Sequence, residues 1–281
     1  MPSYSGVWAL PAQMQAVGQG LWPPNYVVPI GLIAGGSYLT IANSIQYLSL
    51  ASTGNSSYFG DLSVGRITIS ACSSTTRAVF GGGEVGAGSV SNVVDYTTFA
   101  STGSSTDFGD LTVGRYSLAG CSSSTRGLFG NGTISGGGYT NVIDYITIAT
   151  TGNATDFGDL ISAITQISAC SSTTRGVWGG GYNGSAAQSS IVYVTIASAG
   201  NATSFGNLTV ARRQLAACSS STRGVFAGQS DGASNVVDYI TIASTGNATD
   251  FGDMIVPVGE VAACSSSTLD RKRTRLNSSH T

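Results

Sequence analysis

The hydrophobic positions of this chain recur as short runs separated by turns of Ser, Thr, Gly, Asn and Asp. Arg126–Gly130 (RGLFG) is an apolar run that ends in glycine, and Asn141–Ala149 (NVIDYITIA) is rich in Val, Ile, Thr and Tyr. Runs of this kind, bounded by turn residues, are typical of β-strands. Phe157–Leu160 begins a further strand, and Ile161–Cys170 leads into the next apolar run. Helical periodicity is absent, so the pattern predicts an all-β fold.

The pattern of strands and turns is repeated along the chain in units of about 48 residues. Three landmarks mark each unit: a cysteine, a phenylalanine and a tyrosine. They are Cys72, Cys121, Cys170, Cys218 and Cys264; Phe59, Phe108, Phe157, Phe205 and Phe251; and Tyr47, Tyr96, Tyr145, Tyr193 and Tyr239. Within each series, successive members are 49, 49, 48 and 46 residues apart. Three or four short strands in a unit of this length predict the blade of a β-propeller, and five units predict five blades.

Each unit also carries a set of short motifs at fixed places. Double glycines end the apolar strand, a core of two aliphatic residues followed by Asp and Tyr forms the next strand, and an Arg precedes the next blade. These motifs are Gly35-Gly36, Gly81-Gly82 and Gly179-Gly180; Val93–Tyr96, Val142–Tyr145 and Val236–Tyr239; and Arg66, Arg115 and Arg212. Together they resemble the Kelch repeat over about residues 31–269, which implies a propeller fold and leaves the ligand open. The chain departs from the Kelch pattern where Phe stands for Trp in all five copies, and where Ile164 and Val258 replace Arg.

The two ends of the repeat region indicate how the ring closes. The last copy stops at Thr268, where its apolar strand would begin, and residues 31–36 (GLIAGG) supply an orphan strand of that type. We expect this N-terminal strand to complete the last blade. Such pairing closes a five-bladed ring and leaves no open sheet edge.

The segments outside the repeat differ from it in composition. Residues 270–281 hold the only lysine and the only histidine, and DRKRTRLNSSH differs at Arg273 alone from DRKSTRLNSSH, the translation of a common sequencing adapter. We interpret this tail as adapter read-through, after which the natural protein could continue with more blades, and a native basic arm is the alternative. Residues 1–30 contain the motifs Ser5–Trp8 (SGVW), Gln13–Ala16 (QMQA) and Gly20–Pro23 (GLWP). With these motifs the segment resembles the N-terminal segments of structural and tail-fibre proteins predicted in marine phages. That resemblance implies docking to a virion subunit, with packing onto the ring as the alternative.

Composition and charge exclude some classes of binding partner. Charged residues make up 9% of the chain, against about 25% in average proteins. Without residues 270–281 the chain has 8 Arg against 13 Asp and Glu, a net charge of −5, so we expect no nucleic-acid partner. The first thirty residues lack a signal peptide, and the longest apolar stretch, residues 26–34, is too short to span a bilayer. We therefore expect no membrane insertion and a location on a virion or another extracellular surface.

The chain lacks the residues that most catalytic sites need. No histidine precedes His280, which excludes a Ser-His-Asp triad, a His general base and a His-ligated metal from the repeat region. The five cysteines occupy equivalent positions on separate blades, so we expect buried thiols and no disulfides. We predict a non-catalytic module without a cofactor. The alternative is a carbohydrate-active enzyme, similar to glycosidases or sialidases, that uses carboxylates of the loops.

Pairs of carboxylates recur in one turn of three copies. They are Asp107 and Asp110, Asp156 and Asp159, and Asp250 and Asp253. Oxygen-rich loops can bind Ca²⁺, which takes six to eight oxygen ligands. Two carboxylates in a tight turn more often accept hydrogen bonds from backbone N–H groups. Turn caps are therefore the expectation, and a weak Ca²⁺ site is the alternative.

Two further sets of residues are candidates for ligand binding. An arginine follows the Ser/Thr turn in four copies, and these arginines could hold an anionic sugar through bidentate contacts. The alternative is that each pairs with an Asp of a neighbouring strand, such as Asp95 or Asp144. The loops after the glycines differ between copies while the other turns hardly vary, and function on rigid scaffolds is usually carried by such loops. The candidates are Arg77, Arg126, Arg175 and Arg223 in the turns, and Tyr139 and Tyr182 in the variable loops. We expect these loops to bind a glycan or a surface protein.

Overall fold

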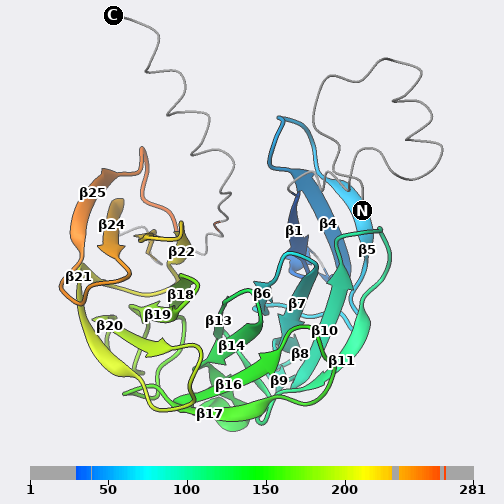
Figure 1. The fold of residues 1–281 in the computed structure, drawn as a ribbon, viewed down its shortest axis with the longest axis horizontal. Helices are drawn as coiled ribbons and strands as arrows, with labels where there is room; N and C mark the ends of the chain where they lie inside the picture. The colour runs from blue at the N-terminus through cyan, green and yellow to red at the C-terminus, as the bar shows by residue number, and fades with distance from the viewer. Residues whose placement is uncertain (1–29, 39, 230–233, 260–262, 264–281) are drawn as a thin grey trace, which may run out of the picture.

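A computed structural model describes residues 30–38, 40–229, 234–259 and 263 of the chain. Their strands form five small antiparallel sheets arranged in a ring as the blades of a β-propeller (Figure 1). Helical structure in these residues is limited to one short 3-10 turn, η1 (Ser135–Gly137). The prediction of an all-β fold with five blades is therefore confirmed.

Blades 2 to 5 each contain four strands that follow one another from the centre of the ring to its rim. Blade 2 is formed by β6 (Ser70–Ser73), β7 (Arg77–Gly81), β10 (Val93–Thr98) and β11 (Thr106–Asp110). Blade 3 is formed by β13 (Ala119–Ser122), β14 (Arg126–Gly130), β16 (Val142–Thr147) and β17 (Thr155–Asp159). Blade 4 is formed by β18 (Ser168–Ser171), β19 (Arg175–Gly179), β20 (Gln188–Thr195) and β21 (Thr203–Arg212). Blade 5 is formed by β22 (Ala216–Ser219), β23 (Arg223–Ala227), β24 (Val236–Thr241) and β25 (Thr249–Asp253).

Blade 1 has three strands within the described residues: β1 (Ile30–Ala34), β4 (Ser44–Ser49) and β5 (Ser57–Asp61). Its first strand, β1, pairs with β4 in the register Leu32↔Tyr47. The N-terminal apolar strand thus takes the second place in a blade, as predicted. Its predicted pairing with the chain around Cys264 falls outside the described residues.

Three small two-stranded sheets lie in the connections between the main strands. They are β2 (Ser37–Tyr38) with β3 (Thr40–Ile41), β8 (Glu84–Gly86) with β9 (Ser89–Val90), and β12 (Arg115–Tyr116) with β15 (Thr133–Ile134). The third of these sheets joins the segment that enters blade 3 to the loop between its second and third strands. The small sheets therefore tie the loops to the body of the ring.

The three sequence landmarks of the repeat have distinct packing roles. In every blade the tyrosine of the third strand meets the phenylalanine of the fourth edge to face, with ring centroids 5.8–6.1 Å apart, an arrangement that aromatic pairs favour. The cysteine of an inner strand packs against a glycine of the next blade. A Cβ added at Gly127 would lie 2.4 Å from the sulfur of Cys72, and one at Gly224 would lie 2.5 Å from that of Cys170. The cysteine and the glycine thus constrain each other across the blade boundary.

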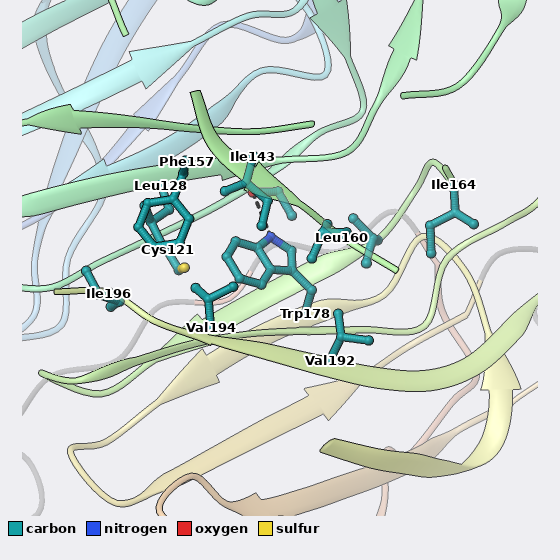
Figure 2. Close-up of a cluster of buried hydrophobic side chains, with 12 residues drawn as sticks. Cys121, Leu128, Ile143, Phe157, Leu160, Ile164, Trp178, Val192, Val194 and Ile196 are labelled. Carbon is teal, nitrogen blue, oxygen red and sulfur yellow. Dashed lines mark hydrogen bonds between the residues drawn. The ribbon is translucent and has the colours of Figure 1, made fainter. Parts of the chain in front are cut away.

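The hydrophobic core is divided among the blade boundaries rather than gathered in one centre. Figure 2 shows the cluster between blades 3 and 4, where Trp178 is surrounded by Leu160, Val192 and Val194. Trp178 is fully buried, and its indole N–H donates to the carbonyl of Ala119 at 3.1 Å. Because adjacent blades share such clusters, each blade buries its apolar faces only when its neighbours are in place.

Three buried ion pairs join the segment that enters a blade to the third strand of that blade. They are Arg66–Asp95 in blade 2, Arg115–Asp144 in blade 3 and Arg212–Asp238 in blade 5, and all six side chains are fully buried. Burial lowers the pKa of each guanidinium, and the adjacent carboxylate opposes that shift. Two of the carboxylates also accept a hydroxyl and a backbone N–H from the preceding blade, at Thr112 and Thr209. The ion pairs therefore also connect neighbouring blades.

Blade 4 replaces the ion pair with two aliphatic side chains. Ile164 stands at the arginine position and Val192 at the aspartate position, and both are buried in the cluster around Trp178. Replacing a buried ion pair by apolar residues of similar volume is often neutral or stabilising, whereas removing one partner leaves a buried charge without its counterion. Within this one chain, the fold accepts both solutions as long as the two positions change together.

This comparison predicts how blade 3 responds to single and double substitutions. Asp144→Val leaves Arg115 buried without its carboxylate, and we expect it to lower the free energy of unfolding by about 3–5 kcal/mol. Arg115→Ile combined with Asp144→Val reproduces the pair of blade 4, and we expect it to cost about 1 kcal/mol or less. Urea unfolding of the wild type, both single variants and the double variant measures the coupling. A double variant as unstable as the sum of the two singles would contradict this account.

Candidate functional site

The antiparallel blades divide the connections between two faces of the ring. The turns after the first and third strands of each blade lie on one face, here called the turn face. The connections after the second and fourth strands lie on the other, here called the loop face. The Ser/Thr turns belong to the turn face, and the loops that differ between copies belong to the loop face. This arrangement follows from the up-and-down order of the strands that the sequence predicts.

On the loop face, the two predicted tyrosines are brought together. A Cβ added at Gly184 would meet the Tyr139 ring at 3.3 Å, so the ring lies against that glycine. The hydroxyl of Tyr182 donates to the carbonyl of Gly184 at 2.8 Å, and the guanidinium of Arg213 stacks on the Tyr182 ring 4.5 Å from its centroid. We call these four residues the tyrosine cluster.

Two different blades contribute to the tyrosine cluster. Tyr139 follows η1 in the loop of blade 3 and pairs with Thr133, while Tyr182 lies in the loop of blade 4 and pairs with Thr165. The hydroxyls of those two threonines are hydrogen-bonded to each other at 2.9 Å in the interior. Both tyrosine rings are half-buried, and each therefore has a fixed position and an exposed part.

The turn face has a cavity of about 1000 Å³ at the centre of the ring. Four blades line it, mainly with the ends of their inner strands and the Ser/Thr turns that follow, and blade 5 adds Val225 of β23 and Phe251 of β25. Its lining residues are Ser73, Ser74, Thr75, Ser122, Ser123, Ser124, Ser171, Ser172, Thr173, Cys218, Ser219, Ser220, Ser221, Thr222, Arg223, Val225 and Phe251. Hydroxyl side chains dominate, and Arg223 is the single charged residue of the lining.

Some of these hydroxyls hold the ring together. The Ser122 hydroxyl donates to the carbonyl of Ser73 at 2.8 Å and accepts the Ser73 backbone N–H at 3.2 Å. Ser171 bonds to Ser122, and Ser219 to Ser171, in the same way. The hydroxyls at the tips of the turns, by contrast, make no side-chain hydrogen bond within the described structure. The tip residues are Thr75, Ser124, Thr173 and Ser221.

The candidate arginines of the turns occupy the boundaries between blades. The guanidinium of Arg77 lies over the Tyr96 ring at 4.5 Å and donates to the carbonyl of Ile148 in the next blade at 3.0 Å. Arg126 and Arg175 are placed in the same way. Arg223 lies over Tyr239 at 4.5 Å, and it alone of the four lines the cavity.

The alternative prediction was that these arginines pair with Asp95 or Asp144, and that pairing was wrong. The two carboxylates bind Arg66 and Arg115, which enter the blades from the preceding segment. Arg77, Arg126 and Arg175 instead donate to carbonyl groups of the next blade. They do connect neighbouring blades, but without an ion pair.

The paired aspartates have a structural role in the turns. The carboxylate of Asp107 accepts the backbone N–H of Gly109 at 3.0 Å, and Asp156 and Asp250 accept those of Gly158 and Gly252 at 2.9 Å. Within the described part of the chain, no three His, Cys, Asp or Glu side chains lie close enough to hold a metal ion. Ca²⁺ binding by Asp107, Asp110, Asp156, Asp159, Asp250 and Asp253 stays a prediction.

Comparison of the chain with protein-family models and with curated proteins finds no match. The resemblance to the Kelch repeat is thus carried by the motifs of the chain itself, and Kelch membership stays a prediction. No helix within the described residues is long and apolar enough to cross a membrane.

The central cavity is the feature that the sequence did not reveal. Each Ser/Thr turn has the composition of an ordinary turn, and the cavity exists because the ring brings four of them together. The available signal was the repetition itself, since residues that recur once per blade on inner strands must surround a common centre.

The buried cysteines predict a clear order of thiol reactivity. Burial raises the pKa of the Cys72 and Cys170 thiols to about 12 and that of Cys121 well above its usual value. At pH 8 this lowers their thiolate fraction on the order of 1,000-fold relative to the unfolded chain. Cys218 is half-buried and lines the cavity, so we expect iodoacetamide to modify it well before these three.

Peptide mapping by mass spectrometry after timed labelling checks the order. The Cys218→Ala variant identifies the peptide that is labelled fast, and labelling in urea shows that all thiols react once the chain unfolds. Labelling of Cys121 at the rate of Cys218 in the native protein would contradict the burial described above.

Proposed function

We propose that this protein is a non-catalytic binding module that recognises a glycan on its loop face through the tyrosine cluster. The observation that carries the proposal is the convergence of Tyr139 and Tyr182, from two blades, at Gly184. Tyrosine offers an apolar ring face together with a polar tip, which suits the apolar C–H faces and hydroxyl edges of a sugar. The guanidinium of Arg213 stacks on the Tyr182 ring and helps to fix its position.

The position of the cluster also favours recognition. It lies in the loops that differ between repeats, on blades whose strands and turns are nearly invariant within the chain. Binding residues placed on loops that a rigid scaffold positions are a common arrangement.

The turns that hold the paired aspartates support a non-catalytic role. A glycosidase needs two carboxyl groups on either side of the scissile bond, about 5–9.5 Å apart. In this chain equivalent aspartates recur in several blades, and each first aspartate accepts a glycine N–H of its own turn. A carbohydrate-active enzyme that uses these carboxylates remains the competing proposal.

The setting we infer is the outer surface of a virion or cell. A surface rich in Ser, Thr, Asn and Gly with 9% charged residues is common among extracellular and particle-borne β-proteins. The N-terminal segment that would dock to a virion subunit lies outside the described residues. In this setting the ring presents its loop face to the glycan.

A glycan array probed with the purified protein tests the proposal. We expect selective binding, and a loss of at least about tenfold in affinity, or about 1.4 kcal/mol, for Tyr139→Ala and for Tyr182→Ala. Thr173→Ala, a change of an exposed turn tip on the opposite face, is the matched control and should bind as the wild type does.

Two results would count against this site. If a folded protein binds no glycan, the ligand is of another class. If binding survives both tyrosine changes and is lost in Thr173→Ala or Ser124→Ala, the glycan occupies the central cavity of the turn face instead.

A further inference from the structure

Neighbouring blades are joined at the rim by a recurring set of hydrogen bonds. The turn before each outer strand presents a glycine and two small or polar residues to the outer strand of the preceding blade. Between blades 2 and 3, the Gly152 N–H donates to the Phe108 carbonyl at 2.7 Å, and the Ala154 N–H to the Asp110 carbonyl at 2.8 Å. The Asn153 side chain accepts the Asp110 N–H at 3.1 Å. We call the turn before an outer strand, here Gly152–Ala154, the docking turn. The segment of the preceding blade that it contacts, here Phe108–Asp110, is the docking edge.

The same three contacts occur at all four junctions between consecutive blades. The glycine N–H bonds are 2.7–2.8 Å long, and so are those from the residue two places later. The side-chain contact is made by Asn153, Asn201 and Asn247, and by Ser104 in the first junction. The docking turns are Gly103–Ser105, Gly152–Ala154, Gly200–Ala202 and Gly246–Ala248, and the docking edges are Phe59–Asp61, Phe108–Asp110, Phe157–Asp159 and Phe205–Asn207.

Backbone approaches backbone so closely at these junctions that the edge has no room for a side chain. A Cβ added at Gly60, Gly109, Gly158 or Gly206 of the edge would lie 2.1–2.7 Å from backbone atoms of the docking turn. On the turn side there is space: among the described residues, nothing lies within 4 Å of a Cβ added at Gly103, Gly152, Gly200 or Gly246. The close approach therefore requires glycine on the docking edge. On the turn side only the backbone favours glycine, at Gly152, Gly200 and Gly246 (φ +152 to +159), and it does not do so at Gly54.

Among the residues that the structure describes, one docking turn and one docking edge have no such partner. The edge Phe251–Asp253 on β25 is exposed: 56% of the Phe251 surface is accessible, against 2–4% at the four packed edges. Ile255 and Val256 beside it are exposed as well. The turn Gly54–Ser56 of blade 1 is exposed along its whole length. No described residue lies within 4 Å of a Cβ at either Gly252 or Gly54.

We propose that the exposed edge Phe251–Asp253 binds the docking turn Gly54–Ser56 of a second copy of this chain. The turn has the required chemistry, since its Gly-Asn-Ser sequence supplies two backbone N–H donors and an amide acceptor in the order used at the other junctions. The edge supplies the matching carbonyls and N–H, a phenylalanine and the glycine that permits close approach. Each copy thus carries both halves of one more junction.

The chain's own turn does not reach its own edge. Figure 1 shows blades 1 and 5 apart from each other at the open side of the ring, and among the described residues no hydrogen bond joins Gly54–Ser56 to Phe251–Asp253. Bringing them together would change the geometry of the four packed junctions, and closely packed interfaces resist continuous deformation. A second copy meets the edge without that cost. The contact joins different surfaces of the two copies, so it is heterologous and can extend from copy to copy.

Sedimentation velocity over a roughly hundredfold range of concentration tests this proposal. We expect the wild type to self-associate as concentration rises. Gly252→Ala places a methyl where the docking turn must approach and should abolish association, while Gly54→Ala makes the same chemical change on the side that has space and should preserve it.

A second pair of variants guards against misfolding, because Gly252 has φ +134, which strains alanine. Asn55→Ala removes the side-chain acceptor of the docking turn at an exposed residue, and we expect several-fold weaker association with unchanged thermal unfolding. Thr53→Ala in the same turn is its control. A wild type that stays monomeric throughout, or association that Gly252→Ala and Asn55→Ala leave unchanged, would overturn the proposal. None of these outcomes depends on the proposed glycan site.

Discussion

Direct backbone contact between neighbouring blades is the constraint on which this structure depends. At the centre of the ring, a serine of each inner strand bonds to both backbone groups of its counterpart in the preceding blade. At the rim, the docking turns reach the outer strands through three further hydrogen bonds. Such contacts tolerate only the smallest side chains, because a Cβ at an edge glycine would overlap the next blade. Close approach is thus one reason for the abundance of Gly and Ser in the chain.

Between the contacts at the centre of the ring and those at its rim lie an arginine and an aspartate position whose residues change together from repeat to repeat. Arg115, Asp144 and Thr112 form a connected polar set at one boundary, and Ile161, Ile164 and Val192 stand at the same places at the next. An intermediate combination would bury a charge or a carboxylate without a partner, which costs several kcal/mol. In blade 2 the third member of the set is Ser63, and one oxygen of Asp95 has no hydrogen-bond partner there within the described structure. The arginine and the aspartate therefore change together between repeats, whereas the third position changes alone in blade 2.

The sequence predicted the strands and the repeat well because both depend on local patterns. The apolar run Arg126–Gly130 is the strand β14 with the same limits, and the Tyr and Phe landmarks turn out to be partners in every blade. Contacts between segments far apart were harder to assign. Blades 2, 3 and 5 each have two recurring arginines, one before the blade and one in its first turn, and nothing local indicates which of them binds the aspartate. Blade 4 distinguishes the two arginines. Val192 stands where other blades have the aspartate, and Ile164 stands where they have the arginine before the blade, whereas the turn arginine Arg175 is retained. The aspartate and the arginine before the blade change together, as partners must.

Contacts within and between blades also explain why the residues of one face of the ring can vary more freely than those of the other. Much of the turn face has a structural role: its inner-strand serines join neighbouring blades, and its first aspartates accept a backbone N–H of their own turn. The loops between the second and third strands contribute less to these contacts, and they differ in length and sequence from one blade to the next. A ring of identical sites matches only a partner with the same symmetry. Recognition of a particular ligand therefore requires residues that differ between blades. Tyr139 and Tyr182 meet this condition, because their cluster occurs at one boundary among five similar blades.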